Sequence, residues 1–159
     1  MSSRSVVISG LYPLARHITR GGSYGRLTGV TVVVVGAVVV DRGCVLVGQR
    51  SGPPELAGFW ELPGGKVEPG EGERAALARE CREELGVEVE VGERVGDDLP
   101  VAGRDGILRV YAVRIVGDAE PRALDHRELR WLGAQDLDEV AWLATNRPLL
   151  PVLARLLRG

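Results

Sequence analysis

The feature that most limits how this chain can fold is the apolar run VTVVVVGAVVV, from Val30 to Val40. A membrane-spanning helix needs about 20 such residues, so this run is too short to cross a bilayer. A short apolar run that is followed by turn residues, here Asp41-Arg42-Gly43, is typical of a buried strand. We therefore predict a buried β-strand over residues 31–40, and a fold that is built around a sheet.

The segments downstream of this strand predict a mixed sheet that is covered by helices. In chain order, the further predicted strands lie at 44–50, 87–95, 107–116 and 129–132, and the predicted helices lie at about 71–85 and 146–159. Gly86 is placed to cap the first helix at its C-terminus, and Pro148 lies in the first turn of the second. Strands on either side of two helices indicate an α/β (α+β) sandwich.

The size and the charge of the chain limit the classes of protein to which it can belong. Its 159 residues suit a single globular domain with a substantial core. The formal net charge of −2 argues against a protein that coats nucleic acid, so we expect no nucleic acid polymer as a partner. Cys44 and Cys81 each lie in an apolar pattern and are far apart, which favours buried thiols over a disulfide framework. We expect a cytoplasmic protein without membrane association, either a monomer or a homodimer.

Residues 1–28 differ in composition from the rest of the chain. They contain arginines but no acidic residue, and they end in the glycine-rich stretch GGSYGRLTG. We interpret them as a basic N-terminal extension that is loosely held. The alternative is a short helix through LYPLARHITR that packs on the domain or on a partner. The compact domain is predicted over residues 29–159.

The predicted central helix carries two separate faces. At 100° per residue, an apolar stripe that includes Leu77 and Cys81 lies beside a stripe formed by Glu80, Glu83 and Glu84. The spacings of three and four residues place these like charges side by side, which destabilises a helix. A solvated acidic face is one interpretation. We favour the alternative, a hard divalent cation such as Mg²⁺, because it binds carboxylate oxygens and removes their repulsion.

The stretch around this helix resembles the signature of the Nudix hydrolases, G(x)5E(x)7REUxEExGU, where U is a bulky apolar residue. Gly65 is followed after five residues by Glu71, and after seven more by RECREELGV, residues 79–87. Every fixed position matches. Cys81 is the one departure, since that apolar slot more often holds Leu, Ile or Val. The resemblance implies a Nudix α/β/α sandwich with a loop–helix–loop catalytic element, and it covers residues 30–157.

The resemblance also implies roles for individual residues. The expected ligands of Mg²⁺, or of Mn²⁺ in its place, are one carbonyl and three carboxylates, those of Gly64, Glu80, Glu83 and Glu84. Arg79 and Glu71 are expected to orient this carboxylate set without touching the metal.

A nucleoside triphosphate is the substrate that this family resemblance implies. A divalent cation would neutralise the phosphate oxygens and generate a nucleophile from water. We expect Glu80, or a loop carboxylate, to accept the proton of that water, and the products to be a nucleoside monophosphate and pyrophosphate. Lys66, the only lysine of the chain, adjoins the two glycines and is predicted to contact phosphate. A solvated lysine is the alternative.

The segment from Val45 to Glu71 looks like that of MutT-type nucleoside triphosphate pyrophosphohydrolases. These include 8-oxo-dGTP-cleaning enzymes and relatives that prefer CTP or dCTP. The resemblance implies that Arg50 contacts the nucleotide, that Asp125 replaces a glutamate which helps the metal and the base, and that Asn146 reads an oxidised purine through its donor and acceptor. The alternatives are an exposed loop acid for Asp125 and a helix N-cap for Asn146.

The nucleobase is left open by the sequence. Leu62 stands where MutT has a phenylalanine near the base, and the stretches RSGPPELAG and LDHRELRWL look more like those of the cytidine-preferring relatives. Trp60 can stack on a base, but we favour core packing, and we expect His126 to be exposed. The sequence leans slightly to the oxidised purine nucleotide.

Two weaker alternatives come from other classes. One is a Nudix hydrolase that acts on ADP-ribose or a dinucleotide; such enzymes usually carry extra residues downstream of the signature, which this chain lacks. The other is a Nudix-fold nucleotide-binding module without catalysis. Such modules commonly lose carboxylates of the signature, whereas all are present here.

Overall fold

The computed structural model describes residues 31–159, so the predicted extension over 1–28 lies outside the described residues. An eight-stranded sheet and two α-helices form the domain. The strands are β1 (Val32–Asp41), β2 (Cys44–Arg50), β3 (Trp60–Glu61), β4 (Gly64–Lys66), β5 (Val89–Arg94), β6 (Leu99–Pro100), β7 (Gly106–Ile115) and β8 (His126–Leu132). The helices are α1 (Glu73–Leu85) and α2 (Leu150–Arg158), with short 3₁₀ helices η1 (Leu137–Glu139) and η2 (Arg147–Leu149).

Strand β1 organises the sheet, because it pairs with three other strands. It runs parallel to β7 along almost its whole length, and antiparallel to β4 near its start and to β2 at its end. Strand β7 in turn pairs antiparallel with β5 and β6, while β2 pairs antiparallel with β3 and β8. The prediction of a mixed sheet is therefore confirmed.

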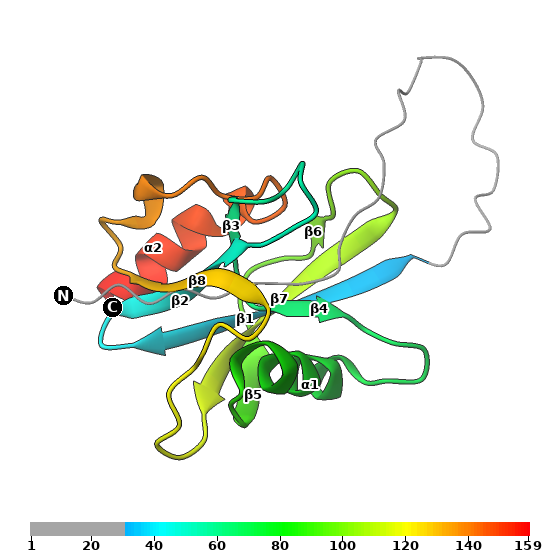
Figure 1. Ribbon diagram of the computed structural model, residues 1–159, viewed down its shortest axis with the longest axis horizontal. Helices are drawn as coiled ribbons and strands as arrows, with labels where there is room; N and C mark the ends of the chain where they lie inside the picture. Colours follow the sequence, from blue (N-terminus) through cyan, green and yellow to red (C-terminus); the bar gives the residue numbers. More distant parts are fainter. Residues whose placement is uncertain (1–30) are drawn as a thin grey trace.

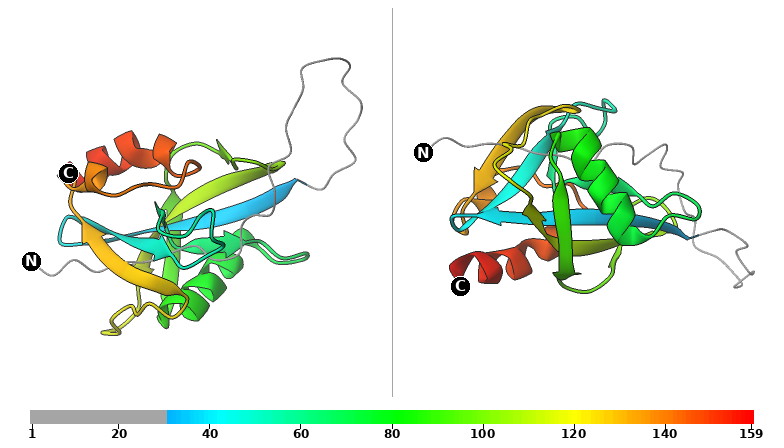
Figure 2. Two further views of the ribbon diagram at one scale, coloured as in Figure 1. Left: turned by 45° about the horizontal axis from the view of Figure 1, so that its top comes forward. Right: turned by 90° about the horizontal axis from the view of Figure 1, so that it is seen from below.

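The two helices cover opposite sides of the strands, as Figures 1 and 2 show. Successive side chains of β1 alternate between two hydrophobic clusters, because a strand has a side-chain period of two. Val34 and Val38 pack with Leu153 of α2, whereas Val35 and Val39 pack in the cluster that contains Leu77 of α1. The valine run is therefore buried on both faces, as predicted, and this packing fixes how α1 lies against the sheet.

Both predicted helices begin later than expected. Helix α1 begins at Glu73 rather than 71, because Glu71 is held in the preceding loop by hydrogen bonds to Glu68. The C-terminal segment first forms η2, which contains Pro148, and only then α2, which has a second proline in its first turn. Proline lacks a backbone N–H and is therefore tolerated at these helix starts.

Three short strands, β3, β4 and β6, were not predicted; β3 has two residues and pairs with β2. Strand β4 has the sequence GGK, and β6 has only two residues, so neither has the alternation that indicates a strand. Their extended conformation comes from pairing with β1 and β7. Within residues 31–159, no helix has both the length and the apolar character needed to span a bilayer.

Candidate active site

Two adjacent glycines in β4 allow the backbone to pass very close to its neighbours. A Cβ atom on Gly64 would lie 1.8 Å from the carbonyl oxygen of Val35, and the φ of Gly64 is +148°. A Cβ atom on Gly65 would lie 2.1 Å from an oxygen of the Glu80 side chain. The fixed glycine of the signature, Gly65, thus leaves the space that the Glu80 carboxylate occupies.

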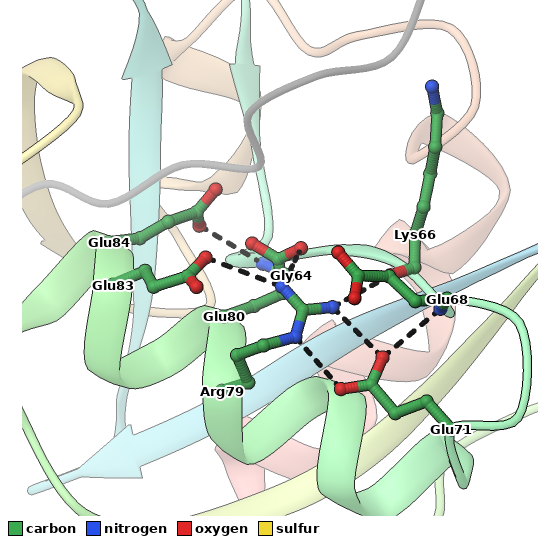
Figure 3. Close-up of polar contacts among 8 residues, drawn as sticks. All are labelled: Gly64, Lys66, Glu68, Glu71, Arg79, Glu80, Glu83 and Glu84. Carbon is green, nitrogen blue, oxygen red and sulfur yellow. Dashed lines mark hydrogen bonds and ion pairs between the residues drawn. The ribbon is translucent and has the colours of Figure 1, made fainter.

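Glu80, Glu83 and Glu84 of α1 project from one side of the helix toward Gly64 (Figure 3). Glu80 is only 8% exposed and Glu84 only 1% exposed, whereas the side chain of Glu83 is 60% exposed. The Gly64 N–H donates a hydrogen bond of 3.3 Å to the Glu84 carboxylate. The interpretation of a solvated acidic face therefore holds for Glu83 alone, because the carboxylates of Glu80 and Glu84 lie between the helix and β4.

Arg79 links the carboxylates to the loop that precedes α1. Its guanidinium donates to both oxygens of Glu71, at 2.8 and 3.0 Å, and to Glu80 and Glu83, at 3.1 and 3.3 Å. It also donates to the backbone carbonyl of Lys66 at 3.1 Å. The hydrogen bonds with Arg79 lower the pKa of Glu71 and raise the pKa of Arg79 itself. This geometry suits an arginine that positions carboxylates.

Burial has a strong effect on the Glu80 carboxyl group. It raises the pKa of Glu80 to about 7, although the charge of Arg79 acts in the opposite direction. Two nearly buried carboxylates, of which one holds its proton close to neutral pH, form an oxygen-rich set that a divalent cation would stabilise. The residues present therefore fit the metal that the signature implies.

Asp125 lies next to Glu84, although the two are far apart in the sequence. Ligand atoms of Glu84, Asp125 and His126 all lie within 4.8 Å of one another. The segment before Asp125 is tied to the end of α1, since the N–H groups of Leu124 and Arg122 donate to the carbonyls of Glu84 and Leu85. The structure thus brings the predicted loop carboxylate to Glu84 of the helix.

The expectation that His126 is exposed was wrong. His126 is half-buried, and both of its ring nitrogens are shielded from solvent, with no hydrogen-bond partner in the described part of the chain. Burial, together with the nearby charge of Arg50, lowers the pKa of His126 to about 3, so the ring is neutral at physiological pH. The side chain is enclosed because β8 pairs with β2, which places His126 opposite Arg50.

The residues predicted to contact the base or the phosphates lie in different surroundings. Arg50 is buried and donates to Glu61 at 2.8 Å. Lys66 is half-buried, and its side chain extends away from the carboxylates in Figure 3. Trp60 lies in the hydrophobic core with the Arg130 guanidinium 4.6 Å from its ring centre, which matches the core-packing interpretation.

Leu62 and Asn146 are joined to each other. Leu62 is fully buried, and its N–H donates to the Oδ1 atom of Asn146 at 2.8 Å. Asn146 occupies the N-cap position of η2 but makes no capping hydrogen bond through its side chain. The side-chain acceptor of Asn146 is therefore engaged by the backbone, and its amide N–H₂ group remains as a donor.

Two buried polar residues next to predicted site residues were missed by sequence reasoning. Glu61 forms the buried ion pair with Arg50, and Thr145 accepts a hydrogen bond from the N–H of Ala102. The sequence feature that could have indicated a buried Glu61 is its position between the apolar residues Trp60 and Leu62 in a strand-like stretch. Thr145 gave no such signal, since its partner lies more than 40 residues away.

Substitution by alanine should have different effects at Gly64 and at Gly65. Gly64→Ala would force a Cβ into the backbone of β1, so we expect loss of the folded protein. Gly65→Ala meets the end of a flexible side chain, so we expect a change in melting temperature of less than about 3 °C and a loss of activity of at least about tenfold. Thermal unfolding and turnover of both variants check this. A fully active Gly65→Ala variant would contradict the assignment of Glu80 to the site.

Comparisons with known proteins agree with this geometry. The NUDIX domain family matches residues 30–153. "Putative 8-oxo-dGTP diphosphatase 2" of Mycobacterium tuberculosis is 57% identical over 132 residues, which cover 80% of this chain and 91% of that protein. "CTP pyrophosphohydrolase" of Escherichia coli is 37% identical over 121 residues, covering 75% and 88%. Among solved structures, the MutT Nudix hydrolase from Burkholderia pseudomallei is 35% identical, with a TM-score of 0.64 and coverage of 76% and 95%.

The chain therefore belongs to the Nudix family, and it is a pyrophosphohydrolase of that family. The fold class and the type of enzyme that the sequence predicted are both confirmed.

Proposed function

We propose that this enzyme hydrolyses a nucleoside triphosphate to the monophosphate and pyrophosphate in a Mg²⁺-dependent reaction, and that its preferred substrate is an oxidised purine nucleotide such as 8-oxo-dGTP. The observation that carries the reaction type is the convergence of Glu80, Glu83 and Glu84 on Gly64, with Asp125 beside them. The base preference is supported by the 57% identity to a protein named as an 8-oxo-dGTP diphosphatase. The two free cysteines suit a cytoplasmic location.

The residues that would hold the cation are the Gly64 carbonyl and the carboxylates of Glu80, Glu83 and Glu84. When bound, a divalent cation supplies charge neutralisation for phosphate oxygens and lowers the pKa of water. Arg79 and Glu71 keep the carboxylates in place through the hydrogen bonds described above. A Lys66 ammonium group that turned toward the substrate would add a positive charge next to phosphate.

Two carboxylates can accept the proton of the attacking water. Glu80 is nearly buried, and burial raises its pKa to about 7 in the cation-free protein, so it loses its proton near neutral pH when a cation binds. Asp125 is exposed on its loop and lies near Glu84. We propose Glu80 as the base and Asp125 as a residue that supports Glu84.

A cytidine triphosphate is the second candidate substrate. Because the Oδ1 atom of Asn146 already accepts a hydrogen bond from Leu62, one of its two lone pairs is used, and the amide N–H₂ group is the donor that the side chain can offer to a base. Cytosine presents acceptors at O2 and N3, which a single amide donor can satisfy. The 37% identity to a CTP pyrophosphohydrolase supports the same substrate.

The substrate proposal is tested by steady-state kinetics on a panel of 8-oxo-dGTP, dGTP, CTP, dCTP and ADP-ribose, with pyrophosphatase and colorimetric phosphate detection. We expect kcat/KM for 8-oxo-dGTP to exceed that for dGTP and dCTP by at least about tenfold, with no turnover when EDTA removes Mg²⁺. A preference for CTP or dCTP would establish the second candidate. Turnover of ADP-ribose alone would overturn both.

The Glu80 pKa predicts how cation binding depends on pH. Glu80 has a pKa of about 7 in the cation-free protein, so below that pH a proton competes with the cation. We expect the affinity for Mn²⁺ to rise by up to about tenfold per pH unit between pH 5.5 and 7, and to level off above pH 8. Isothermal titration calorimetry at several pH values measures this.

The same shift has a consequence for stability. Because the pKa of Glu80 is raised on folding, the folded protein binds more protons than the unfolded chain between about pH 4.5 and pH 7. The contribution of Glu80 to the stability of the cation-free protein therefore falls as pH rises through this window. Glu80→Gln should remove this contribution and flatten the pH dependence of Mn²⁺ binding. An unchanged pH profile in the variant would assign the effect to another group.

A further inference from the structure

His126 occupies an unusual position beside the candidate cation site. Its ring nitrogens are shielded from solvent, and within residues 31–159 neither has a hydrogen-bond partner. A buried polar group without a partner is costly, and it calls for a group that the structure does not contain. One ring nitrogen lies within 4.8 Å of carboxylate oxygens of both Glu84 and Asp125, yet no hydrogen bond joins the ring to either residue.

These separations suit three ligands of one ion. Two atoms that coordinate the same cation at about 2.1 Å can be at most about 4.2 Å apart, so contraction by roughly half an ångström would bring the three ligand atoms into range. The Asp125 side chain is exposed, whereas Glu84 and the His126 nitrogens are enclosed. Rotation of the exposed Asp125 side chain can bring its carboxylate closer to an ion without any change in the sheet.

We infer that His126 supplies a nitrogen ligand to a divalent cation that it shares with Glu84 and Asp125, and that this ligand makes the site select Mn²⁺ or Co²⁺ over Mg²⁺. The inference rests on the proposed cation-dependent function and adds a residue that the Nudix signature does not contain. Mg²⁺ prefers oxygen ligands, whereas the later first-row divalent ions bind imidazole well. A site with one imidazole therefore gains affinity for Mn²⁺, and more for Co²⁺, but little for Mg²⁺.

The surrounding charges are compatible with a cation at this position. Arg50 is the register partner of His126, and its positive charge acts on the ring. Its guanidinium forms a buried ion pair with Glu61 at 2.8 Å, which compensates its charge. The carboxylates of Glu84 and Asp125 then give the surroundings of His126 a net negative charge.

The inference is tested by pulsed electron paramagnetic resonance of the full-length protein with bound Mn²⁺ and inorganic pyrophosphate, a ligand that contains no nitrogen. We expect a ¹⁴N coupling typical of a coordinated imidazole. Protein that carries ¹⁵N-labelled histidine should show the coupling change to that of ¹⁵N, which identifies the donor without any mutation. A spectrum of bound Mn²⁺ without a histidine coupling would overturn the inference.

Variants measure the selectivity. His126→Gln should remove the coupling and weaken Mn²⁺ and Co²⁺ binding by at least about tenfold, while Mg²⁺ binding changes by less than about threefold. His17→Gln, which changes the other histidine of the chain, is the matched control and should retain the coupling. An equal loss for Mg²⁺ and Mn²⁺ would assign His126 a merely structural role. If Mn²⁺ did not bind wild-type protein at all, the proposed cation-dependent function would fail together with the inference, whereas bound Mn²⁺ without nitrogen leaves that function intact.

Discussion

Glu84→Gln is expected to lower kcat by at least about a hundredfold while the protein remains folded. Glu84 is the most enclosed carboxylate of the site, it accepts a hydrogen bond from Gly64, and it lies next to Asp125. Glutamine keeps the shape of the side chain but removes its charge, and with it one oxygen ligand for a cation. Because the substitution also removes repulsion from Glu80, the melting temperature of the cation-free protein should not fall.

Comparison with two other glutamates makes this result specific. Glu83→Gln should lower kcat by more than about tenfold, but by less than Glu84→Gln does. Glu83 is largely exposed, so water can replace part of its contribution to cation binding. Glu93→Gln changes an exposed glutamate of β5 that lies outside the site, and it should leave turnover unchanged. Full activity of Glu84→Gln would exclude this residue from the set that holds the cation.

Arg79→Ala is expected to lower turnover by about 10- to 100-fold, although Arg79 need not touch the substrate. The arginine makes hydrogen bonds to three carboxylates, so its removal leaves Glu71, Glu80 and Glu83 without their common partner. Since Arg79 lowers the pKa of Glu80, its loss should also raise that pKa and move the rise of Mn²⁺ affinity to higher pH. Turnover and calorimetric titration of Mn²⁺ against pH measure the two effects.

The matched control is Arg82→Ala on the same helix. Arg82 pairs with Glu88 at 2.6 Å, but both side chains are exposed, and such surface pairs contribute little. We expect Arg82→Ala to retain full turnover, whereas Arg79→Ala should melt about 2–8 °C lower in the absence of cation. Equal effects of the two substitutions would show that Arg79 acts through general helix stability.

The parts of the fold that follow from periodicity could be predicted from the sequence. The valine run, the helix that Gly86 caps and the longer strands were all expected, because burial imposes periods of two and 3.6 residues. The carboxylate stripe was also expected, since it lies within one helix. Strand β4 was not, because it owes its extended conformation to its pairing with β1.

The enclosure of the site residues could not be predicted either. Burial of Glu80 and Glu84 depends on how closely β4 approaches α1, which only the glycine contacts reveal. The position of His126 depends on the pairing of β8 with β2, two strands that are far apart in the chain. The engagement of Asn146 by the backbone of Leu62 likewise joins residues separated by 84 positions.

The two backbone hydrogen bonds that hold Arg122 and Leu124 to the end of α1 divide the loop between β7 and β8 into an outer part and a part that is anchored to the helix. Residues 117–120 precede this anchor and are all exposed. Insertions or deletions there change the length of the connection but not the place where the chain meets the helix. Related chains can therefore diverge in this outer part, or a fluorescent or affinity peptide can be inserted into it, while Asp125 and His126 keep their distance from Glu84.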